Sequence, residues 1–417
     1  MTYSSRERIS HVVRRLGVGA QPDLVPTLAD TDDAIAVALD LSVPAEDPPA
    51  IPTPASVEEA LESGQLRDGI SFWVDRMASG TRLIEERLTW FWHDHFATNV
   101  RKVRFPYLMW TQHLTLRRHA TGSFADLLHA MAVDPAMLFY LDGSQNRVGE
   151  INENFGREVM ELYTLGVGTY SEDDVVNAAR AFSGWVVAVP RPERPIRVPA
   201  DPWTAFFVPF RHDAGRKSLL GVSGALDAGD AIDILLDQPA TAEFVAAKLY
   251  HHLTGLPAAP ALRADLGRVF RADYAVMDLV EAIVAEPGFL AEESIRSKVR
   301  TPLEKAVTLL QAYPVHERAE EWLAMTLDTA QYLPFLPPNP AGFPDGPRLL
   351  DPYRLVHGLD FAGVVDPRAL GPLDVDALFE RLGVYDVSPS SGDVVASEAN
   401  PLNRLALAIG SPEFALT

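Results

Sequence analysis

The chain has 417 residues, of which 47% are hydrophobic, so it is long enough to bury a large apolar core. Its 57 acidic and 36 basic side chains give a formal net charge of −21. This charge disfavours nucleic acid or an anionic bilayer as the main partner, because Lys and Arg neutralise the phosphates in such complexes. The absence of cysteine excludes disulfides, thiolate metal sites and cysteine nucleophiles.

Several helix starts are indicated by residues whose side chains accept hydrogen bonds from free backbone N–H groups. Others are indicated by proline at the first helical position, where its missing N–H costs nothing. The starts predicted in this way are Ser56, Ser171, Pro239 and Thr301. Apolar residues at helical spacing predict further helices over residues 82–96, 108–118, 124–133 and 277–284. The fold class is therefore expected to be mainly α.

We expect a multi-helix single globular domain, 1–417, with a small β-ribbon inserted at about residues 185–222. Two short strands, 185–189 and 205–210, flank a loop rich in proline and arginine. Residues 1–66 would hold N-terminal helices and a proline-rich connector, and residues 67–184 a helical core. Residues 223–417 would hold the C-terminal helices and a proline-rich loop, 334–347, that cannot be helical.

The N-terminal segment gives an expectation about location. Residues 1–20 are basic but lack the apolar stretch of a signal peptide. The longest apolar runs fall far short of the roughly 20 residues that a membrane span requires. We therefore expect a cytoplasmic protein with no membrane partner.

The segment 91–103 is the most informative stretch, because His93 and His95 can each bind a metal or transfer a proton near neutral pH. Residues two apart on a continuous helix point about 200° from each other. Both could reach one metal only if the helix loosens, which Thr98 and Asn99 would permit. The structural alternative is a buried His95 satisfied by a carboxylate, with His93 at the helix surface.

A second polar segment, 152–161, supplies acids and amides. Glu158 and Glu161 are three apart and share a helical face, so they could bind a cation or divide acid and base roles. Glu153, Arg157 and Glu161 recur at intervals of four, which is equally the spacing of an ion-pair ladder.

His212 and Asp213 follow the second predicted strand and are expected on a turn. Loop residues of these types are frequent site residues, although a turn-capping Asp is equally ordinary. The chain contains no H-E-x-x-H, no Walker loop, no G-x-S-x-G and no complete G-x-G-x-x-G.

Seven segments, in the right order along nearly the whole chain, resemble the bacterial family known as domain of unknown function number 1800. They are residues 91–103, 152–168, 178–185, 212–221, 239–250, 298–302 and 337–344. The resemblance implies a pattern but no catalytic roles; its positions here are His93, His95, Asn154, Arg157, Glu158, Glu161, Trp185, His212 and Asp213. Relatives are commonly exported, whereas the missing leader suggests a cytoplasmic, biosynthetic member.

The leading hypothesis is a metal-dependent enzyme, oxidative or hydrolytic, that acts on a small molecule and not on nucleic acid. The metal would be iron, zinc, manganese or copper, and its predicted ligands are His93, His95, Glu158 and Glu161. The predicted catalytic residues are Arg157, which would orient an anionic substrate, and His212 with Asp213, of which His212 would be the acid–base group or a further ligand.

Two alternatives remain open from the sequence. A metal-free enzyme would use the same histidines and glutamates as general acids and bases. A non-catalytic binding or scaffold protein would use them as buried ion-pair networks that fix helix packing.

Overall fold

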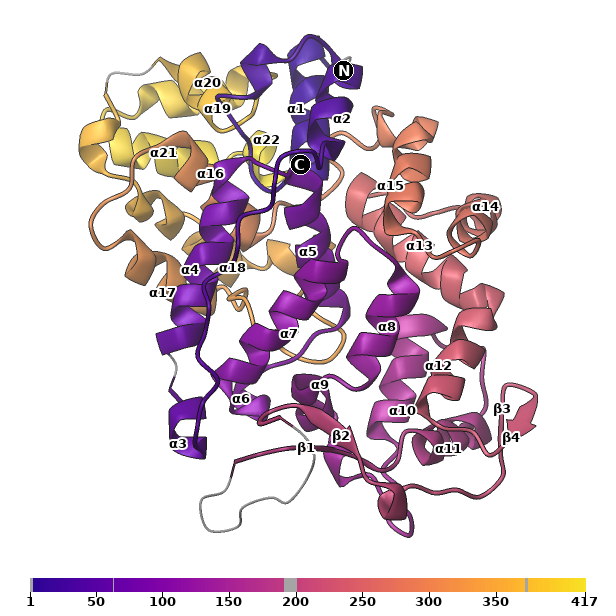
Figure 1. The fold of residues 1–417 in the computed structure, drawn as a ribbon. Helices are drawn as coiled ribbons and strands as arrows, with labels where there is room; N and C mark the ends of the chain where they lie inside the picture. The colour runs from indigo at the N-terminus through magenta and orange to yellow at the C-terminus, as the bar shows by residue number, and fades with distance from the viewer. Residues whose placement is uncertain (1–2, 63, 191–200, 372–373) are drawn as a thin grey trace.

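Helices make up most of the computed structural model, which describes residues 3–62, 64–190, 201–371 and 374–417 (Figure 1). The predicted fold class, a mainly helical single domain with a small β-ribbon, is confirmed. The helices of the first half are α1 (Ser5–Leu16), α2 (Thr31–Leu39), α3 (Val57–Ala60), α4 (Gly64–Ser79), α5 (Leu83–His95), α6 (Val100–Val103), α7 (Pro106–His119), α8 (Phe124–Ala132), α9 (Pro135–Tyr140), α10 (Asn154–Glu158) with the π-helix Val159–Thr164, and α11 (Glu172–Ala181).

The second half continues the helical pattern after a short β region. Its helices are α12 (Ala228–Asp237), α13 (Pro239–Thr254), α14 (Pro260–Phe270), α15 (Val276–Ala285), α16 (Pro302–Ala312), α17 (Ala319–Thr329), α18 (Pro352–His357), α19 (Val375–Arg381), α20 (Pro389–Ser397), α21 (Pro401–Ile409) and α22 (Pro412–Ala415). Short 3-10 turns lie at Val25–Thr27, Gly143–Gln145, Pro209–Arg211, Pro287–Phe289, Gly346–Leu350, Asp360–Val364 and Pro367–Ala369.

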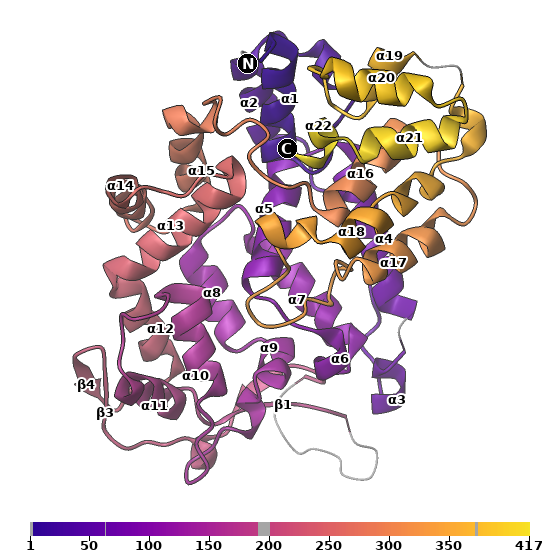
Figure 2. The same cartoon turned by 180° about the vertical axis from the view of Figure 1, so that it is seen from behind.

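The central helix of the fold is α5, in which every residue except Asp94 is buried. Helices α1, α4 and α7 pack directly on it. Helices α13 to α15 lie on one side of this centre and α16 to α22 on the other, as Figures 1 and 2 both show. A helix surrounded in this way has no solvent face, so its polar side chains must find partners inside the protein.

The predicted helix starts are confirmed by the capping groups. Thr301 and Ser171 each form a complete capping box, the first with Glu304 and the second with Asp174. Helix α13 begins at Pro239. The Ser56 side chain accepts a hydrogen bond from the N–H of Glu59, but α3 there extends over four residues only.

The inserted β-ribbon is formed by β1 (Trp185–Val187) and β2 (Ala205–Phe207), which pair antiparallel. Residues 191–200 of the predicted connecting loop lie outside the described residues. The same insertion holds a second hairpin, β3 (Lys217–Leu219) with β4 (Val222–Gly224), that was not predicted. Its two turn residues, Leu220 and Gly221, both have positive φ, as the tightest hairpin turns require.

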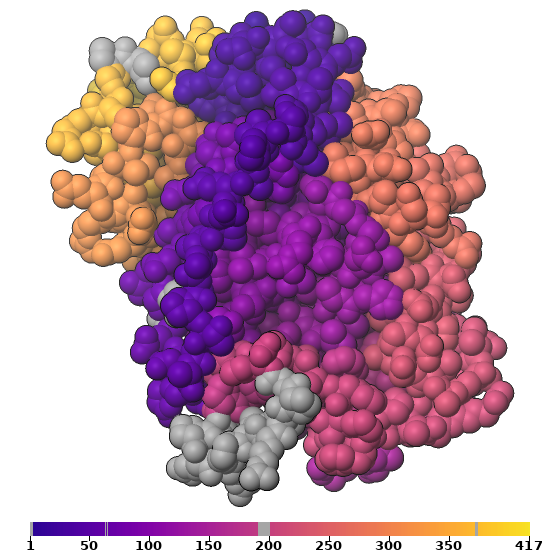
Figure 3. Space-filling model, in the orientation of Figure 1, coloured from indigo at the N-terminus to yellow at the C-terminus, as the bar shows by residue number. Residues whose placement is uncertain are grey.

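Two proline-rich segments run without regular structure. The connector between α2 and α3 crosses the surface as an extended strap along α4 (Figures 1 and 3), where Arg82 donates hydrogen bonds to the carbonyls of Leu41 and Val43 at 2.6 and 2.7 Å. The proline-rich loop, residues 334–347, folds against α5 and α7 (Figure 2) and gives way to a 3-10 turn at Gly346. Among the described helices, none combines the length and apolarity that a membrane crossing needs.

Candidate active site

The two imidazoles of α5 leave the helix in opposite directions. His93 Nε2 accepts a hydrogen bond from the backbone N–H of Phe335 at 3.1 Å, and its ring packs 5.1 Å from that of Trp73. Burial lowers the pKa of His93 to about 3, so the ring is neutral and can accept. The alternative that placed His93 at the helix surface is wrong: the side chain is 1% exposed, because the proline-rich loop covers that face of α5.

Asp94, between the two histidines, also holds the proline-rich loop. Its Oδ1 accepts a hydrogen bond from the N–H of Phe343 at 2.7 Å. A Cβ atom on Gly342, whose φ is +99°, would lie 2.3 Å from the same oxygen, so only glycine permits this approach. Burial raises the pKa of Asp94 to about 6, although the positive charge of Lys248 and the N–H of Phe343 oppose the rise.

His95 connects α5 to two other helices. Its Nε2 donates to the backbone carbonyl of Tyr163 at 3.1 Å, and its Nδ1 lies 3.1 Å from Nζ of Lys248. The carbonyl can only accept, so it fixes the tautomer and leaves Nδ1 as the acceptor for the lysine. The expected carboxylate partner of His95 is therefore replaced by a carbonyl and an amine. Burial, and next the charge of Lys248, hold the pKa of His95 well below its usual value.

The Tyr163 carbonyl is available because α10 ends in a π-helix. The N–H of Leu165 reaches back five residues to the carbonyl of Met160 at 2.8 Å, and the hydroxyl of Thr164 donates to the carbonyl of Val159 at 2.7 Å. The last carbonyls of a helix have no N–H ahead of them, and π-helices are frequent at functional sites. His95 thus joins α5 to the π-helix that overlaps the end of the second polar segment.

Lys248 completes this cluster from α13, which packs against the π-helix. The side chain is half-buried, and burial lowers the pKa of Lys248 below its usual value of 10.5, an effect that the negative charge of Asp94 partly offsets. Sequence reasoning missed this residue. A detectable signal was present, because Lys248 is the single charged residue in the apolar run 244–250 and one of only five lysines in the chain. We refer to Asp94, His95 and Lys248 as the amine site.

Glu158 and Glu161 lie on the same chain segment as Tyr163 but do not contact the amine site through any hydrogen bond in the described residues. Burial, with the nearby charge of Glu161, raises the pKa of Glu158. Glu161 accepts a hydrogen bond from the Tyr170 hydroxyl at 3.2 Å. Both carboxylates are partly exposed, and their pairing to bind a cation or to divide acid and base roles stays a prediction.

Arg157 belongs to an ion-pair cluster at the surface. It pairs with Glu153 at 3.3 Å, as the ladder predicted, but its shorter contact of 2.7 Å is with Glu172 on α11. The predicted continuation of the ladder to Glu161 is not formed, because the wider π-helix begins after Glu158 and changes the angle between successive side chains.

His212 and Asp213 fix the chain that follows β2. His212 Nδ1 lies 3.0 Å from the carbonyl oxygen of Ser183, and Asp213 forms an ion pair with Arg180 at 2.7 Å. Both contacts attach this turn to the end of α11, which accounts for the residues structurally. No hydrogen bond or ion pair of the described residues links either of them to the amine site.

The fit of the residues to a metal ion depends on free lone pairs. The Nε2 lone pair of His93 is taken by Phe335, and the two ring nitrogens of His95 are taken by Tyr163 and Lys248, so the imidazoles as placed do not fit a shared metal. In the described ranges no three His, Asp or Glu side chains are grouped to hold one ion. Metal binding stays a prediction, and the candidate ligands that remain for it are Glu158 and Glu161.

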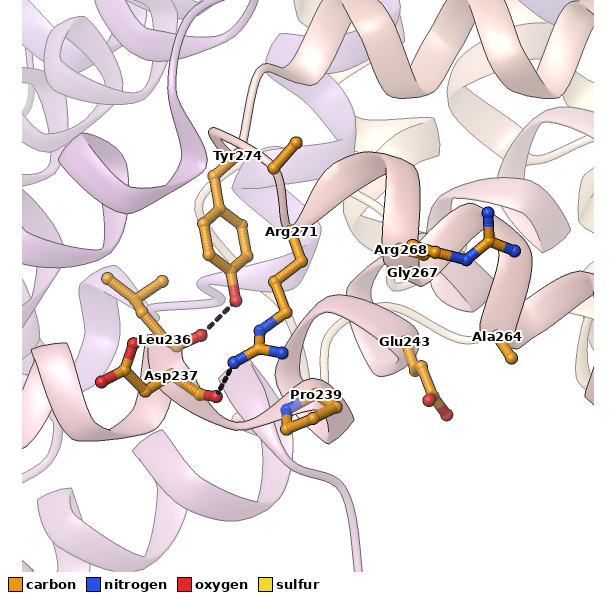
Figure 4. A pocket seen from close by; sticks show the side chains of 10 residues that line it. Leu236, Asp237, Pro239, Glu243, Ala264, Gly267, Arg268, Arg271 and Tyr274 are labelled. Atoms are coloured by element: carbon orange, nitrogen blue, oxygen red, sulfur yellow. Dashed lines mark hydrogen bonds between the residues drawn. The ribbon is translucent and has the colours of Figure 1, made fainter.

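Two surface hollows of the described structure lie apart from the amine site. The larger, of about 450 Å³, lies between α12, α13 and α14 (Figure 4). There the Tyr274 hydroxyl and the Arg271 guanidinium donate to the last carbonyls of α12, those of Leu236 and Asp237, each at 2.5 Å. A smaller hollow of about 350 Å³ is formed by residues around Arg147 and Phe210. Neither is lined by a predicted site residue.

The fold thus places this protein in the class of mainly helical domains, and its polar site is buried on the central helix. The chain belongs to the family described as "Protein of unknown function (DUF1800)", whose sequence profile matches residues 11–416. Comparison with curated proteins and with solved structures finds no match. The resemblance inferred from the sequence is therefore confirmed. Because membership of this family does not define a function, the function of the protein must be argued from the site itself.

Proposed function

We propose that the protein is an enzyme that carries out metal-independent acid–base chemistry on a small molecule at the amine site. The observation that carries the proposal is the 3.1 Å contact between Nζ of Lys248 and Nδ1 of His95, whose other nitrogen is fixed by the Tyr163 carbonyl. Groups whose pKa values are displaced by burial and by a specific neighbour are typical of catalytic sites.

The three residues have distinct roles in this proposal. Lys248 in its neutral form takes a proton from the substrate, and the resulting ammonium is stabilised by His95 and by the charge of Asp94. His95 is a positioning residue, because its two nitrogens are occupied by protein groups. Asp94, with its pKa raised to about 6, can exchange a proton near neutral pH.

The test is a search for turnover with matched variants. The purified protein is incubated with pools of small metabolites, and consumption is followed by mass spectrometry. Lys248→Met and His95→Gln are expected to lower any turnover by about 100-fold or more, the typical contribution of a positioned acid or base. Lys102→Arg, which alters an exposed lysine, is the control and should retain activity. Unchanged turnover in Lys248→Met would contradict the proposal.

The metal-dependent alternative keeps a test of its own. Elemental analysis of freshly purified protein should find less than one metal ion per chain if the imidazoles act as described above. Stoichiometric iron, zinc, manganese or copper that is lost in Glu158→Gln and Glu161→Gln would favour the metal enzyme instead.

The non-catalytic alternative is supported by one specific observation. His93 and Asp94 both accept hydrogen bonds from backbone N–H groups of the proline-rich loop, which is a structural role. A scaffold would lose stability but no turnover when these residues are replaced. The metabolite experiment therefore also distinguishes the scaffold from the enzyme.

A further inference from the structure

We propose that Lys305 is a site of reversible covalent modification, at which its amine takes up carbon dioxide and forms a carbamate that pairs with Arg300. Lys305 belongs to α16 and not to α5 or α13, so the proposal does not rest on the function of the amine site. The support comes from the missing partner of Lys305 Nζ, from an unpartnered N–H group of the neighbouring guanidinium and from the small space beside the amine.

Lys305 is the lysine that lacks a partner. Each of the other four donates a hydrogen bond to a side chain or to a backbone carbonyl; they are Lys102, Lys217, Lys248 and Lys298. Among the described residues, Nζ of Lys305 forms neither a hydrogen bond nor an ion pair, although the residue is only 9% exposed. Because an ammonium that is buried without a partner is costly, this position favours the neutral amine.

Arg300 lies beside Lys305 and also lacks an anionic partner. Its Nη1 donates to the hydroxyl of Thr308 at 3.1 Å, and Lys305 and Thr308 are neighbours because residues three apart share a helix face. Its Nε donates to the carbonyl of Phe414 at 2.8 Å, whereas Nη2 is buried and has no hydrogen-bond partner. Burial, and next the charge of Arg300, lower the pKa of Lys305 to about 8. An anion formed at Nζ would therefore replace a repulsion by an ion pair.

The small space beside the amine selects the reactant. Lys305 lines neither of the two hollows, so a bulky reactant has no cavity to enter in the described structure. A Cβ atom on Gly358 would lie 3.3 Å from Nζ, and the absence of a side chain there leaves the amine a small space. Carbon dioxide is small enough for it. The carbamate that it forms carries a planar carboxylate, which accepts charge-assisted hydrogen bonds from a guanidinium.

The covalent step balances with carbon dioxide as the only reactant. The lone pair of neutral Nζ attacks the carbon of carbon dioxide, and one pair of π electrons moves to an oxygen. Nζ then releases a proton to solvent, and a carbamate anion remains. One amine and one carbon dioxide thus yield one carbamate and one proton, with no change of oxidation state. Because protonation reverses the step, the concentration of dissolved carbon dioxide sets the occupancy.

The experiment traps the carbamate by esterification. The full-length protein is equilibrated at pH 8 with carbon-13 bicarbonate, which supplies carbon dioxide, and triethyloxonium ion then converts any carbamate to a stable ethyl ester. Peptide mass spectrometry locates the labelled ester. We expect at least about tenfold more ester on Lys305 than on any other lysine, because a pKa of about 8 leaves about half of its amine neutral and no hydrogen bond engages Nζ. Lys305→Arg should abolish the ester at this position.

Lys298 is the matched comparison within the same protein. It is 7% exposed and burial lowers its pKa too, but its Nζ donates to the carbonyl of His252 at 2.9 Å. If burial alone made a lysine reactive, Lys298 would be labelled as strongly as Lys305. Equal or greater labelling of Lys298, or no ester on Lys305, would overturn the proposal. This comparison uses the unaltered protein, so it does not depend on the folding of any variant.

Two variants test the pairing with Arg300. Arg300→Met should lower the ester on Lys305 at least about threefold, because the carbamate would lose its charge-assisted hydrogen bond. Thr308→Val is the milder variant, since it removes only the hydroxyl that holds Nη1 of Arg300, and it should lower the ester in the same direction. Lys102→Arg, which alters an exposed lysine, should leave the ester unchanged. Undiminished labelling of Lys305 in both Arg300→Met and Thr308→Val would refute the pairing.

Discussion

The Nδ1 atom of His95 lies 3.1 Å from Nζ of Lys248, and through this contact the central helix α5 is joined to α13 across 153 residues of sequence. The neighbouring residue, Asp94, and His93 on the opposite face of α5 bind the proline-rich loop instead. Of the three consecutive polar residues of α5, His93 and Asp94 hold the loop and His95 holds the amine, while the charge of Asp94 also acts on Lys248.

Replacing His93 by leucine should destabilise the protein by about 2 kcal/mol, because the buried N–H of Phe335 would lose its acceptor. The free energy of unfolding is measured by urea denaturation. His129→Leu is the matched control: that histidine is exposed and pairs with Asp233 at the surface, so its replacement should change stability by less than about 0.5 kcal/mol. Equal effects of the two substitutions would refute the role given to His93.

Gly342→Ala should destabilise the protein more than Gly346→Ala. Both glycines have positive φ, which costs alanine of order 1 kcal/mol at either position. At Gly342 the new Cβ would also meet Asp94, whereas at Gly346 it meets nothing within 4 Å. Urea denaturation should show a difference of about 1 kcal/mol or more, in the range of strain at tight sites. No difference between the variants would mean that the loop does not rest on Asp94.

Arg157→Met should have little effect on stability, and Arg87→Met a large one. Arg157 forms partly exposed ion pairs, which are worth about 0 to 1 kcal/mol. Arg87 is 3% exposed, pairs with Glu304 at 2.8 Å and donates to the carbonyl of Gly17, so its loss leaves a buried carboxylate unpaired and should cost about 3 kcal/mol or more. Chemical denaturation compares the two variants. A large loss for Arg157→Met would show that its contacts are stronger than their exposure allows.

Stability should fall as the pH is lowered from 7 to 5. Burial depresses the pKa of five histidines, so the folded protein keeps these rings neutral. In the unfolded chain they take up protons below about pH 6.5, so the stability that depends on their neutral form is present above that pH and is lost below it. The five are His11, His93, His95, His113 and His252.

Two aspartates act in the opposite sense. The pKa of Asp94 is raised to about 6 and that of Asp134 to about 7, so the folded state keeps their protons while the unfolded state releases them. Because five groups outweigh two, the unfolded state binds more protons in this window, and stability should decrease by up to about 4 kcal/mol per pH unit. Urea midpoints at pH 5, 6 and 7 measure the effect. A midpoint that is constant or rises towards pH 5 would contradict it.

The helices were predictable from the sequence because their signals are local. The caps at Ser171 and Thr301 and the proline at the start of α13 each determine an element from within a few residues. The opposite directions of His93 and His95 followed from helical geometry alone.

The chemistry of the site was less accessible, because it depends on distant contacts. The burial of His93 is produced by a loop 242 residues further along the chain, and the partner of His95 is a carbonyl exposed by a π-helix that no sequence pattern signalled. Lys248 was overlooked because a lone lysine in an apolar helix carries no spacing pattern. Its rarity in the composition was the available signal.

The titration of Lys248 tests most directly whether its amine can act as a base beside His95. With lysine labelled at the ε carbon, the five lysines give five NMR signals, and Lys248→Arg identifies the one that matters. We predict that this signal titrates below the usual lysine pKa of 10.5 and that its titration shifts when His95 is replaced by glutamine. A Lys248 signal that titrates at or above the usual lysine pKa of 10.5 would contradict the role proposed for this amine.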